Sequence, residues 1–206
     1  MNPLRSLLLA ASVAAGLAGC GGSTTPSAPP PPAAAPPSSP APSTGASALQ
    51  AEATSAAAGD IPDNQVFLAF HDPAAGYSMK YPEGWAQSGS GPNVTFRDKN
   101  NIVRVVVTSA PPPTVTSIKG ELSSLAGARV DRGPSPLTIG GVPAFKAVYT
   151  TESAPNAVTG KRVTLVVDRY YLFQGGKEAV VDLGTPKGVD NVDAYRLMIE
   201  SFRWSS

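Results

Sequence analysis

The chain has 206 residues, 42% of them hydrophobic and 15% charged, and its formal net charge is +1 at pH 7. Because the charges are nearly balanced and form no block of one sign, they argue against nucleic acid as a partner and against an electrostatic membrane patch. One cysteine and one histidine are present, which excludes histidine-rich metal sites.

Residues 1–19 have the layout of a secretory signal peptide. A single positive charge at Arg5 precedes an apolar run from Leu7 to Leu17, as in such signals. This run of about a dozen residues is shorter than the ~20 that a membrane-spanning helix needs. Cys20 ends the tetrapeptide L-A-G-C, which resembles the bacterial lipobox. We therefore expect cleavage before Cys20, lipidation of its thiol, and an exported protein anchored to the bacterial cell membrane by that lipid.

Lipidation of Cys20 has two consequences. Each buried methylene contributes ~0.8 kcal/mol, so two or three acyl chains together give durable anchoring. Since Cys20 is the only cysteine, its acylation leaves no thiol for a disulfide, an iron–sulfur cluster, a Cys-rich zinc site or a cysteine nucleophile.

Residues 20–60 consist largely of Pro, Ala, Ser, Thr and Gly. Such a segment has too little apolar surface to offset the entropy of ordering, so we expect a disordered, partly polyproline-like tether. About 40 residues span ~35 Å as a flexible coil and ~120 Å as polyproline II. The tether would therefore carry the following domain clear of the membrane surface.

Residues 61–206 change to aromatic and β-branched runs broken by Gly and Pro, enough for a single globular domain. Its first half predicts four strand segments and one helix. In chain order these are strands at Phe67–His71, Tyr77–Tyr81, around Val94 and Phe96, and at Ile102–Thr108, then a helix at Val115–Leu125 capped by Thr114 and ended by Gly127.

The second half predicts long strands and a closing helix. The strands are expected at Arg129–Ile139, Val142–Glu152, Lys161–Phe173 and Ala179–Leu183, and the helix is expected to be capped by Asp190 with an inner face of Val192, Tyr195, Ile199 and Phe202. Hairpin-joined strands with helices gathered separately indicate an α+β fold. We expect a central antiparallel sheet flanked by helices, a layered sandwich of the α/β/α type.

Residues 76–85 read G-Y-S-M-K-Y-P-E-G-W and resemble the G-[FY]-x-[FIM]-x-Y-P-x-x-W signature of the PsbP-like family. Asn93–Asp98, followed by Ile102–Val107, is similar to that family's strand pair after the Trp, and the ending Ser201-Phe202-Arg203 also fits. The resemblance implies the fold shared by PsbP, by Ran-binding Mog-type proteins and by many bacterial lipoproteins. It does not imply photosystem binding, because the family's charged and His-bearing docking loops have no match here.

No pattern in the chain points firmly to catalysis. His71 with Asp72 is the candidate for a Ser–His–Asp arrangement, but Asp72-Pro73 indicates a turn and no G-x-S-x-G elbow is present. No phosphate loop and no G-x-G-x-x-G motif follows a strand, so no nucleotide cofactor is indicated. We expect no catalytic residue, no cofactor and no metal.

Asp168 and Asp182 lie in adjacent predicted strands, where they could pair across the sheet. Arg104, Lys161, Arg162 or Arg169 could neutralise them. Cross-strand ion pairs on a solvated face are the ordinary interpretation, and an acid/base pair of the glycosidase kind is the alternative.

The candidate recognition residues are Pro155, Asn156, Tyr170 and Tyr171. Pro155 and Asn156 belong to the loop Ser153–Gly160 between two long strands, and such loops often carry binding, although a plain hairpin connection is the alternative. Tyr170 and Tyr171 are adjacent in one strand and must face opposite sides. We expect one of them in the core and the other as an aromatic spot on an open face.

The leading hypothesis is a non-enzymatic, lipid-anchored, extracytoplasmic binding or accessory domain. Its partners would be the membrane, through Cys20, and a protein or envelope component. One alternative is a carrier or sensor that holds an apolar ligand between sheet and helix, which an enclosed apolar cavity on the order of several hundred Å³ would favour. The other alternative is an uncharacterised hydrolase that depends on His71.

Overall fold

The computed structural model describes Gln50, Thr54 and residues 58–156 and 158–205. The predicted signal peptide, Cys20 and most of the predicted tether lie outside these residues. The elements, in chain order, are β1 Phe67–Asp72, β2 Tyr77–Pro82, β3 Ala86–Ser90, β4 Asn93–Asp98, β5 Asn101–Ser109, α2 Val115–Ser124, β6 Arg129–Ile139, β7 Val142–Glu152, β8 Thr164–Gln174, β9 Lys177–Pro186, α3 Val192–Glu200 and β10 Arg203–Trp204.

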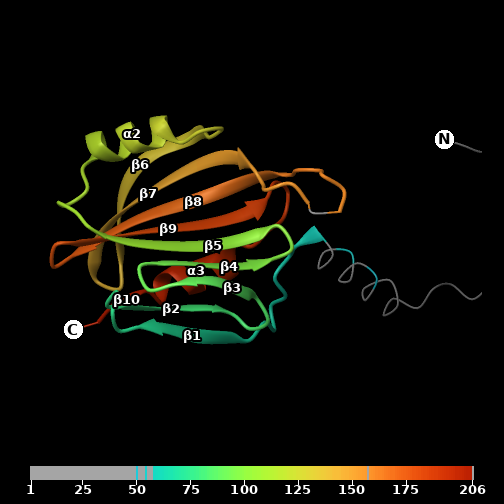
Figure 1. Ribbon diagram of the computed structural model, residues 1–206, viewed down its shortest axis with the longest axis horizontal. Helices are drawn as coiled ribbons and strands as arrows, with labels where there is room; N and C mark the ends of the chain where they lie inside the picture. Colours follow the sequence, from blue (N-terminus) through green and yellow to red (C-terminus); the bar gives the residue numbers. More distant parts are fainter. Residues whose placement is uncertain (1–49, 51–53, 55–57, 157, 206) are drawn as a thin grey trace, which may run out of the picture. The chain divides into compact units, whose positions relative to one another are not determined.

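The strands form two antiparallel sheets (Figure 1). The larger sheet has seven strands in the order β3-β4-β5-β9-β8-β7-β6, and the smaller has three in the order β1-β2-β10. Figure 1 shows α2 beside β6 and the β1–β2 hairpin on the opposite side of the molecule. This arrangement confirms the predicted α+β fold with a central antiparallel sheet, and adds a small second sheet that the sequence did not reveal.

Both faces of the larger sheet are covered at its inner strands β7, β8 and β9, which direct apolar side chains to both sides. One face packs against α3 and the smaller sheet in a core that includes Val94, Phe96, Val105, Val181, Leu183, Tyr77, Met79, Tyr195, Met198 and Ile199. The other face packs against α2, whose Ile118 and Leu122 meet Tyr149, Val167 and Tyr171. No helix among the described residues has the length and apolar character that crossing a membrane requires.

The aromatic residues of the 76–85 signature tie the two sheets together. Tyr77 is fully buried and its ring stacks on that of Phe202, with centroids 5.6 Å apart. Tyr81 stacks on Phe96 of the larger sheet at 4.2 Å. Burial raises the pKa of Tyr77, and the charge of Asp72 raises it further. The signature is therefore part of the packing between layers.

The predicted helix ends were partly wrong. Thr114 caps α2 as expected, its side chain accepting a hydrogen bond from the Ser117 amide. At α3 the N-cap is Asn191 rather than Asp190, whose Oδ1 accepts a hydrogen bond from the Val192 amide at 3.2 Å. Val192 is 69% exposed and does not belong to the inner face, because the first turn of α3 points it toward solvent.

The strands also differ from the prediction. Strand β8 begins at Thr164 rather than at Lys161. Strands β3 and β10 were not predicted, because A-Q-S-G-S has no apolar alternation and β10 has only 2 residues.

A buried network of amide groups holds the start of the described domain against α3 and β5. Asn191 is 3% exposed, accepts a hydrogen bond from the Ile61 amide at 2.8 Å and donates to the side chains of Asn101 and Thr185. Asn101 donates to the carbonyl oxygen of Gly59 at 2.6 Å. The position at which the chain enters the domain is thus fixed by side chains from two distant segments, at residue 101 and at residues 185–191.

We predict that Asn191→Ala lowers the free energy of unfolding by about 1–3 kcal/mol, because it leaves the Ile61 amide and the Asn101 side chain without their buried partner. The matched control, Asn64→Ala, removes an exposed amide nearby and should change stability by less than about 0.5 kcal/mol. Urea denaturation of both variants measures the difference. Equal effects would show that the network does not stabilise the fold.

Candidate functional site

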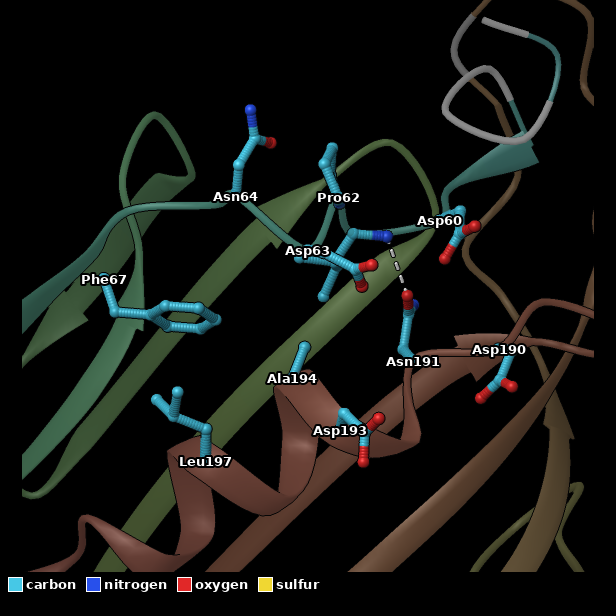
Figure 2. Close-up of a pocket in the computed structure, with 11 residues that line it drawn as sticks. Asp60, Pro62, Asp63, Asn64, Phe67, Asp190, Asn191, Asp193, Ala194 and Leu197 are labelled. Carbon is cyan, nitrogen blue, oxygen red and sulfur yellow. Dashed lines mark hydrogen bonds between the residues drawn. The ribbon is translucent and has the colours of Figure 1, made fainter. Parts of the chain in front are cut away.

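A surface pocket of about 630 Å³ lies between residues 60–67 and α3 (Figure 2). Its apolar lining includes Ile61, Phe67, Ala194 and Leu197, and four aspartates also line it. Figure 2 shows the carboxylates of Asp60 and Asp190 at one end and the side chains of Phe67 and Leu197 at the other, with Asp63 and Asp193 between. The pocket is bordered by residues 60–62, where the chain enters the domain, by the residues before β1, and by the outer side of α3.

The carboxylates of this pocket are mostly unneutralised. Asp193 forms an exposed ion pair with Arg196 at 2.7 Å. Across the described residues, no ion pair within 4.0 Å involves Asp60, Asp63 or Asp190. Within the same residues, no group of three or more His, Cys, Asp or Glu side chains is arranged to hold a metal ion. The arrangement therefore suits a positively charged group of a partner better than a metal centre.

A second hollow adjoins the first along α3. It also has a volume of about 630 Å³ and shares Asp193 and Leu197 with the first pocket. Its charged lining residues are Lys80, Arg196 and Arg203 together with Asp193 and Glu200. The two hollows together, here called the α3 groove, run from an acidic end near the chain entry to an end of mixed charge near β10, with Leu197 exposed between them.

The hydrolase candidates do not come together. His71 is exposed at the end of β1, and Asp72 is its neighbour in the same strand. Adjacent strand residues face opposite sides, so the Asp72 carboxylate is directed away from His71. Asp72 Oδ1 instead accepts a hydrogen bond from the Ala75 amide at 2.8 Å, in the turn that the sequence predicted.

Asp168 and Asp182 lie in adjacent strands, as predicted, but on opposite faces of the sheet. The register places Asp182 opposite Arg169, whereas Asp168 lies opposite Leu183. Asp168 pairs with Lys146 at 2.7 Å. The two carboxylates therefore do not form an acid/base pair. The predicted cross-strand ion pairs are present, with Arg169 as the partner of Asp182, but the expectation of a solvated face was wrong for Asp182, which is buried.

Arg169 is the centre of a buried ionic cluster beneath α2. Its guanidinium donates from Nε and Nη2 to the two carboxylate oxygens of Asp182, at 2.6 and 2.8 Å, and from Nη1 to Glu121 of α2 at 2.6 Å. Burial by itself would lower the pKa of Arg169, but the hydrogen bonds and charge of Asp182 raise it above its ordinary value.

Tyr149 belongs to the same cluster. Its hydroxyl donates to Asp182 Oδ1 at 3.4 Å. Burial, followed by the charge of Asp182, raises the pKa of Tyr149 to about 12. Arg169 is therefore charged and Tyr149 neutral at neutral pH, and the bond from Arg169 to Glu121 ties α2 to the sheet.

The predicted recognition loop is exposed, and part of its polar capacity is used within the loop. Pro155 and Asn156 are both exposed. Asn156 Oδ1 accepts hydrogen bonds from the amides of Val158 and Thr159, at 3.0 and 2.9 Å. Val158, which stands out by no sequence pattern, is 93% exposed. A recognition role for Pro155 and Asn156 remains a prediction.

Tyr170 and Tyr171 were predicted to place one ring in the core and the other on an open face, and the open face was wrong. The two residues do face opposite sides, but Tyr170 is 6% exposed and Tyr171 is fully buried. Tyr170 packs in the core on the α3 side and Tyr171 in the cluster beneath α2. Because layers cover both faces of β8, neither ring is available at the surface.

The α3 groove was missed because its residues come from separate parts of the chain. One signal was present, since Asp60 with Asp63 and Asp190 with Asp193 repeat the spacing D-x-x-D. That spacing alone does not show that two segments about 130 residues apart meet.

Comparison with known proteins agrees with this architecture. Residues 65–126 match the family model of PsbP. This segment contains the 76–85 signature and runs from just before β1 to just after α2, so the predicted resemblance to PsbP is confirmed. No curated protein matches the chain.

Several solved structures are similar to the chain. A protein from Bacteroides thetaiotaomicron is 17% identical with a TM-score of 0.45, over 67% of this chain and 48% of that one. The chain thus spans about half the length of that protein. Cyanobacterial PsbP (CyanoP) from Synechocystis sp. PCC 6803 is 17% identical with a TM-score of 0.47, over 71% and 98% of the two chains. The Ran-binding protein Mog1p from Saccharomyces cerevisiae is 9% identical with a TM-score of 0.43, over 68% and 96%.

We predict that Arg169→Met lowers the free energy of unfolding by about 3–5 kcal/mol, because Asp182 is left as an uncompensated buried charge. The control, Arg196→Met, removes an exposed partner of Asp193 and should cost less than about 1 kcal/mol. Both values come from urea denaturation at pH 7. A small effect of Arg169→Met would mean that the cluster is not what holds α2 in place.

Proposed function

We propose that this PsbP-like chain is a lipid-anchored, extracytoplasmic protein whose domain 61–206 binds a protein or envelope component without catalysing a reaction. The observation that carries the proposal is the α3 groove. It presents an acidic end, an end that carries both basic and acidic side chains, and the exposed apolar side chain of Leu197 on one surface. Polar and charged rims around apolar contacts are typical of protein interfaces.

The proposed anchor and the groove fit together along the chain. Lipidated Cys20 would hold residues 20–60 as a tether, and the tether would end where Asn101 and Asn191 bind the backbone of Gly59 and Ile61. Asp60 and Ile61 line the groove. A tether of about 40 residues, with a reach of ~35 to ~120 Å, would thus deliver the acidic end of the groove to partners in the envelope.

The carrier alternative has less support. Val181 and Leu183 of the sheet and Met198 of α3 are fully or almost fully buried in one core cluster. The pocket beside α3 lies at the surface, where its aspartates are largely exposed. This lining suits a charged partner segment better than an apolar small molecule.

The anchor is tested by Cys20→Ala in intact bacteria fed a palmitate analogue that can be labelled. We expect the wild-type chain to incorporate the label and to partition with membranes, and the variant to lose both properties because no thiol accepts the lipid. Ser23→Ala, which changes a neighbouring small residue, is the control and should behave as wild type. Retention of the label by Cys20→Ala would contradict lipidation at this residue.

The binding role is tested by photocrosslinking in intact cells. Benzoylphenylalanine replaces Leu197 in the groove or, as the matched control, Val130 of β6, since the two residues are 40% and 42% exposed. We expect a discrete crosslinked partner from position 197 and not from position 130. Identical products from both positions, or none from position 197, would contradict a binding role for the groove.

A further inference from the structure

The described strands leave four sheet edges, and three of them are protected against pairing with another chain. Strand β6 carries prolines at 134 and 136 and two register shifts against β7. Strand β3 has five residues, all exposed, including Gly89, and β10 has only two. Proline, bulges and short length are the devices by which edge strands avoid added strands.

Strand β1 lacks these devices. It reads F-L-A-F-H-D and pairs with β2 from Phe67↔Pro82 to Asp72↔Tyr77 without a register shift. It contains neither proline nor lysine, and its Ala69 and His71 are exposed. Leu68 is 39% exposed, and Val66, which precedes the strand, is 55% exposed. An unprotected edge of this kind favours pairing with an extended segment.

The hydrogen-bond pattern identifies which groups of β1 face outward. The Glu83 amide donates to the Val66 carbonyl at 2.8 Å. Hydrogen-bonded and non-hydrogen-bonded pairs alternate along an antiparallel ladder, so residues 66, 68 and 70 exchange hydrogen bonds with β2, whereas residues 67, 69 and 71 do not. In agreement, the amide of Lys80, which lies opposite Ala69, donates to Ser201 Oγ on the other side of β2. The N–H and C=O groups of Phe67, Ala69 and His71 therefore point away from the sheet.

The charge beside this edge favours a basic occupant. Asp63 and Asn64 lie on the approach to β1, and Asp60 lies three residues before Asp63. Neither aspartate has an ion pair within the described residues. The chain's own residues 20–60 contain no Lys or Arg that could meet these carboxylates. The occupant is therefore a separate polypeptide.

We propose, on the premise of the binding role above, that the outer edge of β1 accepts an extended segment of a partner protein as an additional strand. Main-chain hydrogen bonds to Phe67, Ala69 and His71 hold the segment. A Lys or Arg of the segment, just beyond the N-terminal end of β1, meets the carboxylate of Asp63.

The test uses the full-length chain in detergent and blocked, fluorescent eight-residue peptides. One peptide is three Thr-Val repeats followed by Lys-Lys, because pairing antiparallel to β1 brings the C-terminal end of the peptide to the N-terminal end of the strand, and its counterpart ends in Glu-Glu. We expect saturable binding of the Lys peptide and about tenfold weaker binding of the Glu peptide, by fluorescence anisotropy at low salt. N-methylation of two alternate amides in the Lys peptide should weaken it at least tenfold, because each methyl group removes a main-chain donor.

Variants of the chain locate the site. Ala69→Pro removes an outward N–H and leaves the bonds of β1 to β2 intact, so it should weaken Lys-peptide binding about tenfold, while Ala69→Val retains the donor and the affinity. Combined Asp60→Asn and Asp63→Asn should abolish the preference for Lys over Glu, whereas Asp131→Asn on β6 should not. If Ala69→Pro does not fold, hydrogen exchange of the wild-type chain replaces it. Binding of the Lys peptide should then protect the Ala69 amide from exchange.

Several results would overturn the β1 site. They are no binding of the Lys peptide at millimolar concentration, equal binding of the Lys and Glu peptides, or unchanged binding by folded Ala69→Pro. A concentration-dependent dimer that Ala69→Pro dissociates would identify a second copy as the occupant instead. If Ala69→Pro keeps the crosslink from position 197, the β1 site fails while the binding role stands. If the wild type gives no such crosslink but binds the Lys peptide, the binding role at the groove fails and the β1 site stands.

Discussion

The inner strands β7, β8 and β9 of the larger sheet are covered on both faces, and this constraint decides where many polar and exposed groups of the domain lie. α3 and the smaller sheet occupy one face, and α2 occupies the other. An inner strand such as β8 has no side toward solvent, so both Tyr170 and Tyr171 are buried. Surfaces for a partner are left at the loops, at the sheet edges and along the outer side of α3.

The same constraint explains the ionic cluster beneath α2. Arg169 points from an inner strand into a covered face, where an unpaired charge is costly, and Asp182 and Glu121 satisfy its guanidinium. α2 is a short helix with Gly120 in its interior, so packing and this ion pair, rather than helix propensity, hold it on the sheet. The exposed pair of Arg196 and Asp193 has no comparable structural role.

The asparagine network positions the residues that line both proposed binding surfaces. Asn191 and Asn101 fix the backbone from Gly59 to Ile61 against α3 and β5. Because the chain continues from there through Asp63 into β1, one set of buried hydrogen bonds positions both the acidic end of the α3 groove and the approach to the unprotected edge. A tether ending at Gly59 would place both surfaces next to its point of attachment.

The sequence by itself determined the strand and helix types, most hairpins, the α+β class and the PsbP resemblance, because alternation, turn glycines and the 76–85 signature are local patterns. It also led to the prediction of lipidation at Cys20. Only the tertiary structure decided that Asp168 and Asp182 lie on opposite faces, that Tyr171 is buried, and that the aspartates at 60, 63, 190 and 193 line one groove. The packing of layers and the register of the strands bring distant residues together and separate residues that are near in sequence. Both depend on long-range contacts, which local sequence patterns do not reveal.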